Sequence, residues 1–570
     1  MKKALFLVVP IIALAMLFLN ISPTLAIPFP PNMDPALKTQ NMELYLKAKR
    51  NQPELDAGVP LLVPPLGTYK AIVLLVDFSD NPGTTNPALY ENLLFSRGTY
   101  PTGSMRDYYL ETSYNKFELT GDIDGTIGIP PFWYRMPETY AVYVNGQKGE
   151  GDYPQNVQKL AEDAVEAADP YVDYSQYDND GDGVVDSLII VYAGPRPGDN
   201  NHIWPHQYVM KKTNIVLDGK KLGPYAMISE YEKDLLPEND STIGTFCHEY
   251  GHLLGLPDLY DLSSLGSGIG SWGLMGSGSY NGAPSKGSRP AHLCAYSKMK
   301  LGWVDPVEVV HNQFGTIISC VETSPSVFKL WTNGMYGPEL PEFFLIENRQ
   351  KVGFDDALPG DGLLIYHISD NIRSQYYHPY CIVDIEQADG HFSLNYRDNT
   401  GDKGDPWPGE SGKRAFDRNS TPSNCSFFYQ DTRVAVKNIS DSAPSMTADL
   451  YINDSDPPIG CDLTGNWKSL RPYFRGRRLI GTFEINNIGN ENASTFNVGF
   501  YLSDDGIKLG TFLKRVTIQN GLGAGMNKTC NFGNFSLNSL SNKYIIAVID
   551  PEDKVVEIDK ANNRITRLIP

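Results

Sequence analysis

The chain has 570 residues, more than one ordinary domain holds, so two to four domains are expected. Hydrophobic residues make up 41% of it and aromatic residues 11%, a composition typical of a folded protein. The formal net charge is −19 and the sequence contains no basic stripe. This balance argues against nucleic acid or an anionic membrane as a partner and favours a soluble protein that attracts cations.

Residues 1–26 have the layout of a secretory signal peptide. Two lysines precede an apolar run from Ala4 to Leu19, and small residues at Thr24 and Ala26 precede Ile27. An uncleaved anchor is the alternative, because the apolar run is slightly long for a signal. No later apolar run is long enough to span a bilayer, so the sequence predicts a secreted protein, extracellular or associated with the cell surface.

Residues 27–67 are rich in proline around one short helical stretch and are either a pro-segment or an arm that wraps on the next domain. An α/β pattern follows over residues 68–305. Continuous apolar runs predict buried strands at 69–80 and 186–194, and residues 153–170 predict an amphipathic helix. The apolar face of that helix comprises Val157, Leu160, Ala161, Ala164, Val165 and Ala168.

Short strands separated by glycine, proline and aspartate predict a β-rich region over 306–452 that completes the preceding module. Residues 453–460 have the composition of a linker. Residues 461–570 repeat an all-β pattern with a hairpin turn signal at Asp505-Gly506, which predicts a β-sandwich. Seven cysteines lack the C-x-x-C spacing of zinc ribbons, and Cys461 with Cys530 is the expected disulfide.

The segment "GTFCHEYGHLLGLPDLYD" (244–261) carries the chemistry of the chain. Residues at i and i+4 share a helix face, so His248 and His252 can bind one metal ion through their ring nitrogens. The helix is expected to begin near residues 239–242, which have cap-type side chains, and to end at Gly255. The neighbouring Cys247 points in another direction and is expected to be a buried small residue, not a nucleophile.

After the helix the chain can double back and offer Asp258 as a third ligand, with Asp261 as the fallback. Zinc held by two imidazoles and one carboxylate keeps a fourth position for water and polarises that water. Glu249, one position beyond His248, is then the expected general base, which passes the proton to the leaving amine. A helix with ordinary surface histidines is the simpler alternative.

The pattern H-E-x-x-H-x-x-G followed by a third ligand resembles the metzincins, which also carry a methionine turn beneath the zinc; Met275, in the glycine-rich stretch 270–282, fits that turn. The aspartate and the wording "HEYGHLLGLPDLYD" resemble the secreted immune inhibitor A-type metallopeptidases. "AIVLLVDFSD", "DNDGDGVVDSLIIVYAG", "IWPH", "EFFLIENRQ" and "LPGDGLLIYHISD" extend the resemblance over about 69–450. It implies a metzincin-like zinc peptidase domain that cleaves proteins or peptides, and Tyr280 as a candidate oxyanion donor. His202 and His206 around "IWPH" are either substrate-side or structural.

"DNDGDGVVD" (178–186) has the spacing of a calcium loop. Asp178, Asp180 and Asp182 occupy positions 1, 3 and 5, and the carbonyl of Val184 and the carboxylate of Asp186 fit positions 7 and 9. A strand follows in place of an exiting helix, so the expected ion is a structural Ca²⁺. The alternative is a solvated acidic turn.

A second acidic group, Asp398, Asp402 and Asp405, is equally compatible with a calcium site and a polar loop.

The tail from about 460 resembles the CARDB domain, an immunoglobulin-like sandwich, through "FEINNIGNENASTFNVGFYLS" and "YIIAVIDPEDKVVEIDKANNRI". Such modules position or anchor an enzyme, which implies contact with a cell surface. Together these features predict a secreted zinc-dependent endopeptidase. The alternative is an inactive adhesion or binding protein on a metallopeptidase scaffold.

Overall fold

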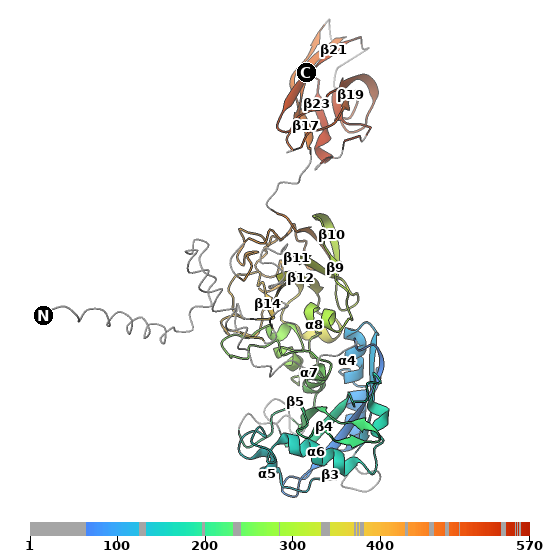
Figure 1. The fold of residues 1–570 in the computed structure, drawn as a ribbon. Coiled ribbons are helices and arrows are strands. Elements are labelled where there is room, and N and C mark those ends of the chain that lie inside the picture. Colours follow the sequence, from blue (N-terminus) through green and yellow to red (C-terminus); the bar gives the residue numbers. More distant parts are fainter. Residues whose placement is uncertain are drawn as a thin grey trace, which may run out of the picture. The chain divides into compact units, whose positions relative to one another are not determined.

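The computed structural model (Figure 1) describes residues 64–569 except 125–132, 196–199, 232–240, 284, 332–341, 370–371, 373–374, 377–380, 428–430, 455–460, 474–477, 490, 537–542, 553, 556 and 558–559. The predicted signal peptide, nearly all of the 27–67 segment and most of the 453–460 linker lie outside the described residues. Contacts group the chain into two compact units, Met1–Asn453 and Asp454–Pro570. None of the helices among the described residues is long and apolar enough to cross a membrane.

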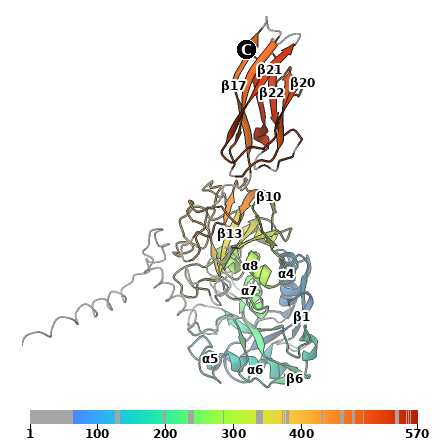
Figure 2. The ribbon, with the colours of Figure 1, turned by 45° about the horizontal axis from the view of Figure 1, so that its top comes forward.

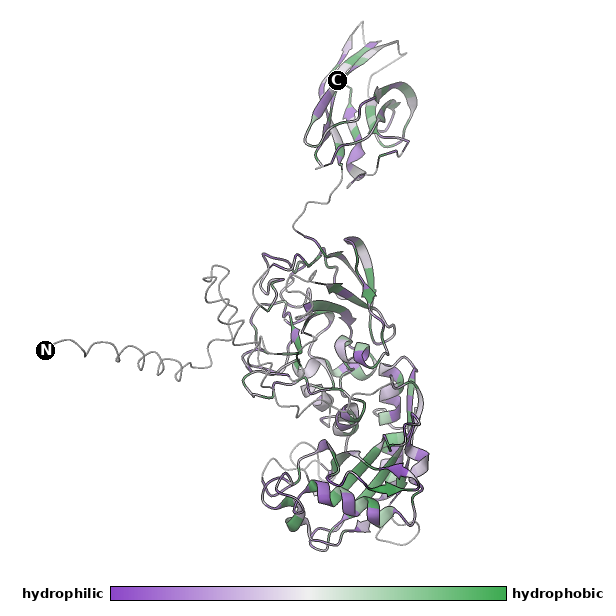
Figure 3. Cartoon of the chain, viewed as in Figure 1, coloured by the Kyte–Doolittle hydropathy of each residue, from purple (hydrophilic) through white to green (hydrophobic). Residues whose placement is uncertain are grey.

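A mixed six-stranded sheet forms the base of the first unit. Its order is β2 (Phe117–Asp124), β1 (Gly67–Asp77), β4 (Leu188–Pro195), β8 (Pro224–Tyr231) and β5 (His206–Val209), with β3 (Tyr134–Arg135) also pairing with β1. All of these pairs are parallel except β5 with β8, so the sheet ends in an antiparallel edge strand. The central strands β1 and β4 are buried on both faces and appear as hydrophobic arrows in Figure 3.

Helices cover this sheet. α6 (Val157–Ala168) buries the predicted apolar face and packs on β1, and α7 (Ile243–Leu253) packs on β8 and β5. The remaining short helices and strands of this part are α3 (Pro87–Tyr90), η2 (Glu91–Phe95), α4 (Met105–Thr112), α5 (Tyr140–Val144), η3 (Tyr174–Tyr177), β6 (Val216–Leu217), β7 (Lys220–Lys221), η4 (Gly270–Trp272), η5 (Ser277–Tyr280) and α8 (Ala295–Lys300).

Two further sheets follow in the same unit. One has the order β14 (Val383–Ile385), β13 (Gly362–Ser369), β12 (Glu342–Arg349), β11 (Val327–Trp331) and β9 (Val307–Glu308), and the other β10 (Gln313–Ser319), β16 (Ser445–Tyr451) and β15 (Ala435–Lys437). Between β12 and β13 lies η6 (Gly353–Ala357). The apolar runs at 342–350, 360–370 and 446–452 thus form strands as expected.

Strand β12 joins two hydrophobic cores, because successive side chains of a strand point to opposite faces. Phe343 and Leu345 pack in the large core that contains β1, β4 and α7, whereas Phe344 and Ile346 pack in a second core with β16. The β-rich region therefore shares its core with the α/β part.

The second unit consists of a three-stranded sheet, β17 (Leu463–Tyr473), β18 (Arg478–Asn487) and β21 (Asn527–Ser536), and a four-stranded sheet, β20 (Thr511–Ile518), β19 (Phe496–Ser503), β22 (Tyr544–Ile549) and β23 (Arg564–Leu568). A short helix, η7 (Ala561–Asn563), precedes β23. Figure 2 shows the long strands of this unit running alongside one another. Its core is its own, with Trp467, Phe483, Phe500 and Phe532 at the centre.

The expected disulfide between Cys461 and Cys530 is wrong, because these two cysteines are not bonded to each other in the described part of the chain. Cys530 pairs with Phe483 on β18, which in turn pairs with Trp467 on β17, so Cys530 and Cys461 are separated by two strand spacings and several residues along the strand. Strand spacings of about 4.8 Å place them beyond the roughly 7 Å Cα separation that a disulfide tolerates.

Candidate metal centre

The histidine-bearing helix begins and ends where its sequence dictates. Thr242 is the N-cap residue of α7, but its hydroxyl donates to Lys286 O and caps no helix amide, contrary to the predicted side-chain cap. Gly255 has φ +84°, the left-handed conformation that glycine adopts without strain. The amide of Gly255 donates to His252 O (2.9 Å) and that of Leu256 to Gly251 O (3.1 Å), the pair of bonds of a Schellman motif. This turn reverses the chain within three residues.

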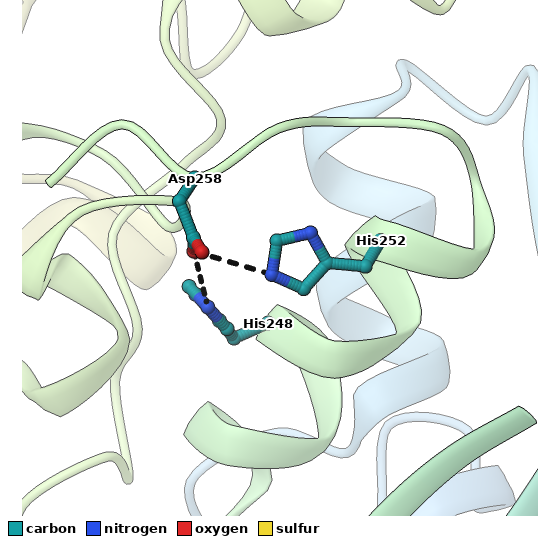
Figure 4. A group of neighbouring side chains, drawn as sticks. All are labelled: His248, His252 and Asp258. Carbon is teal, nitrogen blue, oxygen red and sulfur yellow. Dashed lines mark ion pairs between the residues drawn. The ribbon is translucent and has the colours of Figure 1, made fainter. Parts of the chain in front are cut away.

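The reversed chain brings Asp258 to both histidines (Figure 4). Its Oδ1 lies 3.1 Å from His248 Nε2 and 3.2 Å from His252 Nε2, and each of these side chains is only 12–13% exposed. The three residues offer ligand atoms that all lie within 4.8 Å of one another. Local helix geometry and one turn are enough to assemble this group.

Backbone carbonyls fix both imidazole rings. His248 Nδ1 donates to Leu274 O (3.0 Å) and His252 Nδ1 to Leu256 O (2.7 Å). A carbonyl only accepts, so the proton of each neutral ring is on Nδ1 and the lone pair of Nε2 points toward Asp258. The sequence offered no signal for these two carbonyls.

Met275 is buried under the helix, where a Cβ on Gly251 would lie 2.7 Å from its Sδ. The Met275 carbonyl accepts from the amide of Leu259, the residue after Asp258. The segment of Leu274 and Met275 therefore supports both the helix and the chain that carries Asp258.

The fallback ligand Asp261 has a different position. It is buried and is not part of the histidine group; its Oδ1 accepts from Ser263 N (2.8 Å) and its Oδ2 from Gly266 N. The carboxylate thereby holds the loop after residue 261.

The three-residue group lies in a cleft of about 1080 Å³. Glu249, 6% exposed, and Tyr280 line this cleft too, as does His206 on β5. Three lining features were not predicted to belong to the cleft. They are Tyr260, whose ring stacks on His248 at 6.2 Å and 20°, the exposed Trp204, and Arg397, Asn399 and Thr400 from a distant segment. His202 is not among the lining residues.

The acidic loop 178–186 gathers only part of its predicted ligands. Asp178, Asp180 and Asp186 offer oxygens within 4.8 Å of one another, whereas Asp182 Oδ1 accepts from Val184 N (2.8 Å). Lys220 Nζ lies 2.6 Å from Asp178 Oδ2. Burial, reinforced by Asp180 and Asp182, raises the pKa of Asp186 to about 6 against opposing backbone hydrogen bonds.

Two imidazole nitrogens from one helix turn and a carboxylate oxygen from the following loop, gathered in a cleft of an α/β domain, are the arrangement expected of a metallopeptidase. Comparison with protein families makes the class specific. Residues 66–304 match the family model of the immune inhibitor A peptidase M6 catalytic domain, and residues 462–567 match the CARDB model. The chain therefore carries an M6 peptidase catalytic domain and a C-terminal CARDB domain.

Two curated relatives each match part of the chain. The chain is 30% identical over 284 residues to the pre-pro-metalloprotease PrtV of Vibrio cholerae serotype O1 (strain M66-2), over 41% of this chain and 30% of that protein. It is 28% identical over 329 residues to immune inhibitor A of Bacillus thuringiensis subsp. alesti, over 48% of this chain and 46% of that protein. The matches thus span less than half the length of each relative.

Among solved structures, the CARDB domain of a Pyrococcus furiosus protein, crystallised in complex with di-metal ions, is 22% identical. That match covers 20% of this chain and 92% of the other, with a TM-score of 0.17.

Proposed function

We propose that the protein is a secreted zinc-dependent endopeptidase that hydrolyses extracellular proteins. His248, His252 and Asp258 bind the zinc, and Glu249 is the general base. The convergence of two Nε2 atoms on one carboxylate oxygen within the cleft is the observation that carries this proposal.

The electrostatics of the group fit a cation. With both Nδ1 protons donated to carbonyls, Asp258 Oδ1 faces the two Nε2 atoms at 3.1 and 3.2 Å. Burial opposes a charge on His252, but the Asp258 carboxylate outweighs it and raises the pKa of His252 to about 9, so the group favours positive charge at Nε2, which a proton or a metal ion can supply. Two imidazoles and one carboxylate are also a ligand set of catalytic zinc sites.

Each residue then has a separate task. Zinc in such a site supplies Lewis acidity that activates water and polarises the scissile carbonyl. Glu249, on the helix face next to His248, takes the proton of the attacking water at its carboxylate and passes it to the leaving amine. Tyr280 donates a hydrogen bond from its hydroxyl to the carbonyl oxygen as negative charge develops there.

The edge strand beside the cleft supports a peptide substrate. Strand β5 is the edge strand of the sheet, and its residues His206, Gln207 and Tyr208 line the cleft beside the histidines. An extended peptide can pair with such an edge through its backbone, which places successive carbonyls along the site. Met275 beneath Gly251 supports a metzincin-like arrangement of this domain.

We further propose that the loop 178–186 binds a structural Ca²⁺ through Asp178, Asp180 and Asp186, with Val184 O as an additional ligand. The clustered oxygens and the raised pKa of Asp186 support it. Secretion through residues 1–26 and cell-surface contact through the CARDB domain complete the proposal.

The test is casein hydrolysis by the zinc-loaded, processed protein with and without o-phenanthroline, together with its zinc content. Glu249→Gln should retain zinc and lose turnover by a factor of about 10² to 10⁴, because only proton transfer is removed. Glu166→Gln, an exposed carboxylate on α6, is the matched control and should leave both unchanged.

Near-normal turnover of Glu249→Gln would refute the assignment of the base, and hydrolysis that resists the chelator would refute the zinc. If the zinc-loaded protein cleaves nothing, the inactive adhesion or binding protein is the better interpretation.

A further inference from the structure

Three carboxylates meet far from the histidines in sequence. Asp389, Asp402 and Asp405 each offer one oxygen, and these oxygens lie within 4.8 Å of one another. Asp405 is fully buried and the other two are half-buried. Asp398, grouped with Asp402 and Asp405 on sequence grounds, is exposed and outside this cluster, so the sequence grouping was wrong in that member.

One oxygen of Asp405 has no hydrogen-bond partner among the described residues. Asp405 Oδ2 accepts from Trp272 Nε1 (2.8 Å) and from the amide of Asp402 (2.9 Å). Asp405 Oδ1 is buried, and within the described part of the chain it accepts no hydrogen bond. A buried, ionised oxygen in this state is strongly destabilising unless a cation or a proton satisfies it.

Nearby positive charge does not neutralise the cluster. Among the described residues, one basic side chain pairs with a carboxylate of the cluster: Nδ1 of the exposed His391 lies 3.1 Å from Asp389 Oδ2. Lys413 Nζ donates instead to the backbone carbonyl of Asp389 (3.0 Å). The loop 178–186 differs, because there Lys220 pairs directly with Asp178.

We propose that Asp389, Asp402 and Asp405 form a second structural cation site, which takes Ca²⁺. Carboxylate oxygens are the ligands of hard cations, and the irregular loop suits the flexible coordination of Ca²⁺ better than the strict octahedron of Mg²⁺.

The cation fixes one wall of the cleft. Thr400 O accepts from the amide of Ser271 (2.6 Å), and Asn399 O accepts from Ser267 Oγ (2.6 Å), so the loop after Asp389 packs on the segment that leads to Met275. Arg397, Asn399 and Thr400 line the cleft. Asp405, a member of the proposed site, also accepts a hydrogen bond from Trp272 Nε1 and so connects this wall of the cleft to the segment before Met275. The inference does not depend on the peptidase activity.

The experiment measures bound calcium per chain by equilibrium dialysis and elemental analysis of the full chain. All samples carry Glu249→Gln so that self-digestion cannot alter the count. Asp389→Asn, Asp402→Asn and Asp405→Asn should each bind one calcium fewer than the parent and lose part of the calcium-dependent rise in Tm. Asp398→Asn, in the same loop, is the matched control and should bind as much calcium as the parent.

Asparagine keeps the size of aspartate and an acceptor oxygen, so the internal hydrogen bonds of the loop can persist in each variant. If Asp405→Asn does not fold, the half-buried Asp389→Asn decides the question. Equal calcium content in the parent and in all folded variants overturns the proposal and leaves a proton on Asp405 as the partner of Oδ1. Zinc content serves as the internal check that the histidine site is unchanged.

Discussion

At the scale of single residues, Gly251 determines how closely the helix can approach its support. The glycine lies between Glu249 and His252, and any Cβ there would lie 2.7 Å from Met275 Sδ and 3.5 Å from its Cε. Both residues are buried, so neither can move into solvent. The helix that carries His248 and His252 therefore packs directly on Met275.

We predict that Gly251→Ala destabilises the protein by about 1–3 kcal/mol, because overpacking outweighs the roughly 1 kcal/mol gain in helix propensity. Thermal unfolding and zinc content measure the effect. Gly223→Ala is the control, since its new Cβ has Val184 Cγ1 at 4.0 Å as its nearest neighbour. Met275→Ala destabilises the protein by itself, but the double mutant should lose less stability than the sum of the two single losses; additive losses would contradict the contact.

Local geometry explains why the histidine group was predictable. His248 and His252 are one helix turn apart, and Asp258 follows a glycine turn, so all three positions depend on eleven residues of chain. The carbonyl of Leu274 that orients His248 comes from a segment 26 residues away, and no periodicity indicates it.

At the scale of elements, strand β12 stabilises the site from the β-rich region. The fully buried Arg349 donates to both oxygens of Asp355 (2.7 and 2.9 Å) and to the carbonyl of Trp272 (2.9 Å). Asp355 Oδ1 also accepts from the amide of His292 (2.9 Å). The strand that links the two cores therefore also holds the segment preceding Met275.

Strand β13 carries a buried charge with consequences for pH. His367 stacks between Phe344 and Phe427, and its nitrogens lie 3.1 Å from Glu342 Oε2 and 3.3 Å from Glu386 Oε1. Burial disfavours the imidazolium, but these two carboxylates outweigh burial and raise the pKa of His367 to about 9.

We therefore predict that this histidine stabilises the fold most below about pH 6.5 and loses its contribution as the pH rises through 9. Because the pKa of His367 is higher in the folded state than in the unfolded state, the folded protein releases this proton at a higher pH. The shift corresponds to a contribution on the order of 3 kcal/mol.

The measurement is the Tm difference between the parent and His367→Gln from pH 6 to pH 9.5, which should shrink toward high pH. His391→Gln, with a side chain that is 76% exposed, should show no such trend. A constant difference across this range would be inconsistent with the charged pair.

At the scale of the whole molecule, each of the two units has its own hydrophobic core. Every residue that lines the cleft belongs to the first unit, and the second unit is built around its own aromatic cluster. Domains with separate cores commonly fold alone.

A chain that ends at Asn453 is thus predicted to keep zinc and to hydrolyse small peptides within about a factor of two of the full chain. Residues 454–570 expressed alone should unfold cooperatively, as seen by calorimetry. Loss of zinc from the shortened chain would show that the second unit supports the site.

The sequence by itself determined the elements and contacts whose partners lie close in the chain. The α6 face, the strands β1, β4, β12 and β13, and the turn at Gly255 follow from periodicity and from glycine conformation, which are local properties.

The tertiary structure alone decided which distant segments meet. The strand register across β17, β18 and β21 separates Cys461 from Cys530. The path of the 389–405 loop places Asp389, and not Asp398, in the acidic cluster. Both outcomes depend on backbone paths between segments, and composition and spacing do not encode such paths.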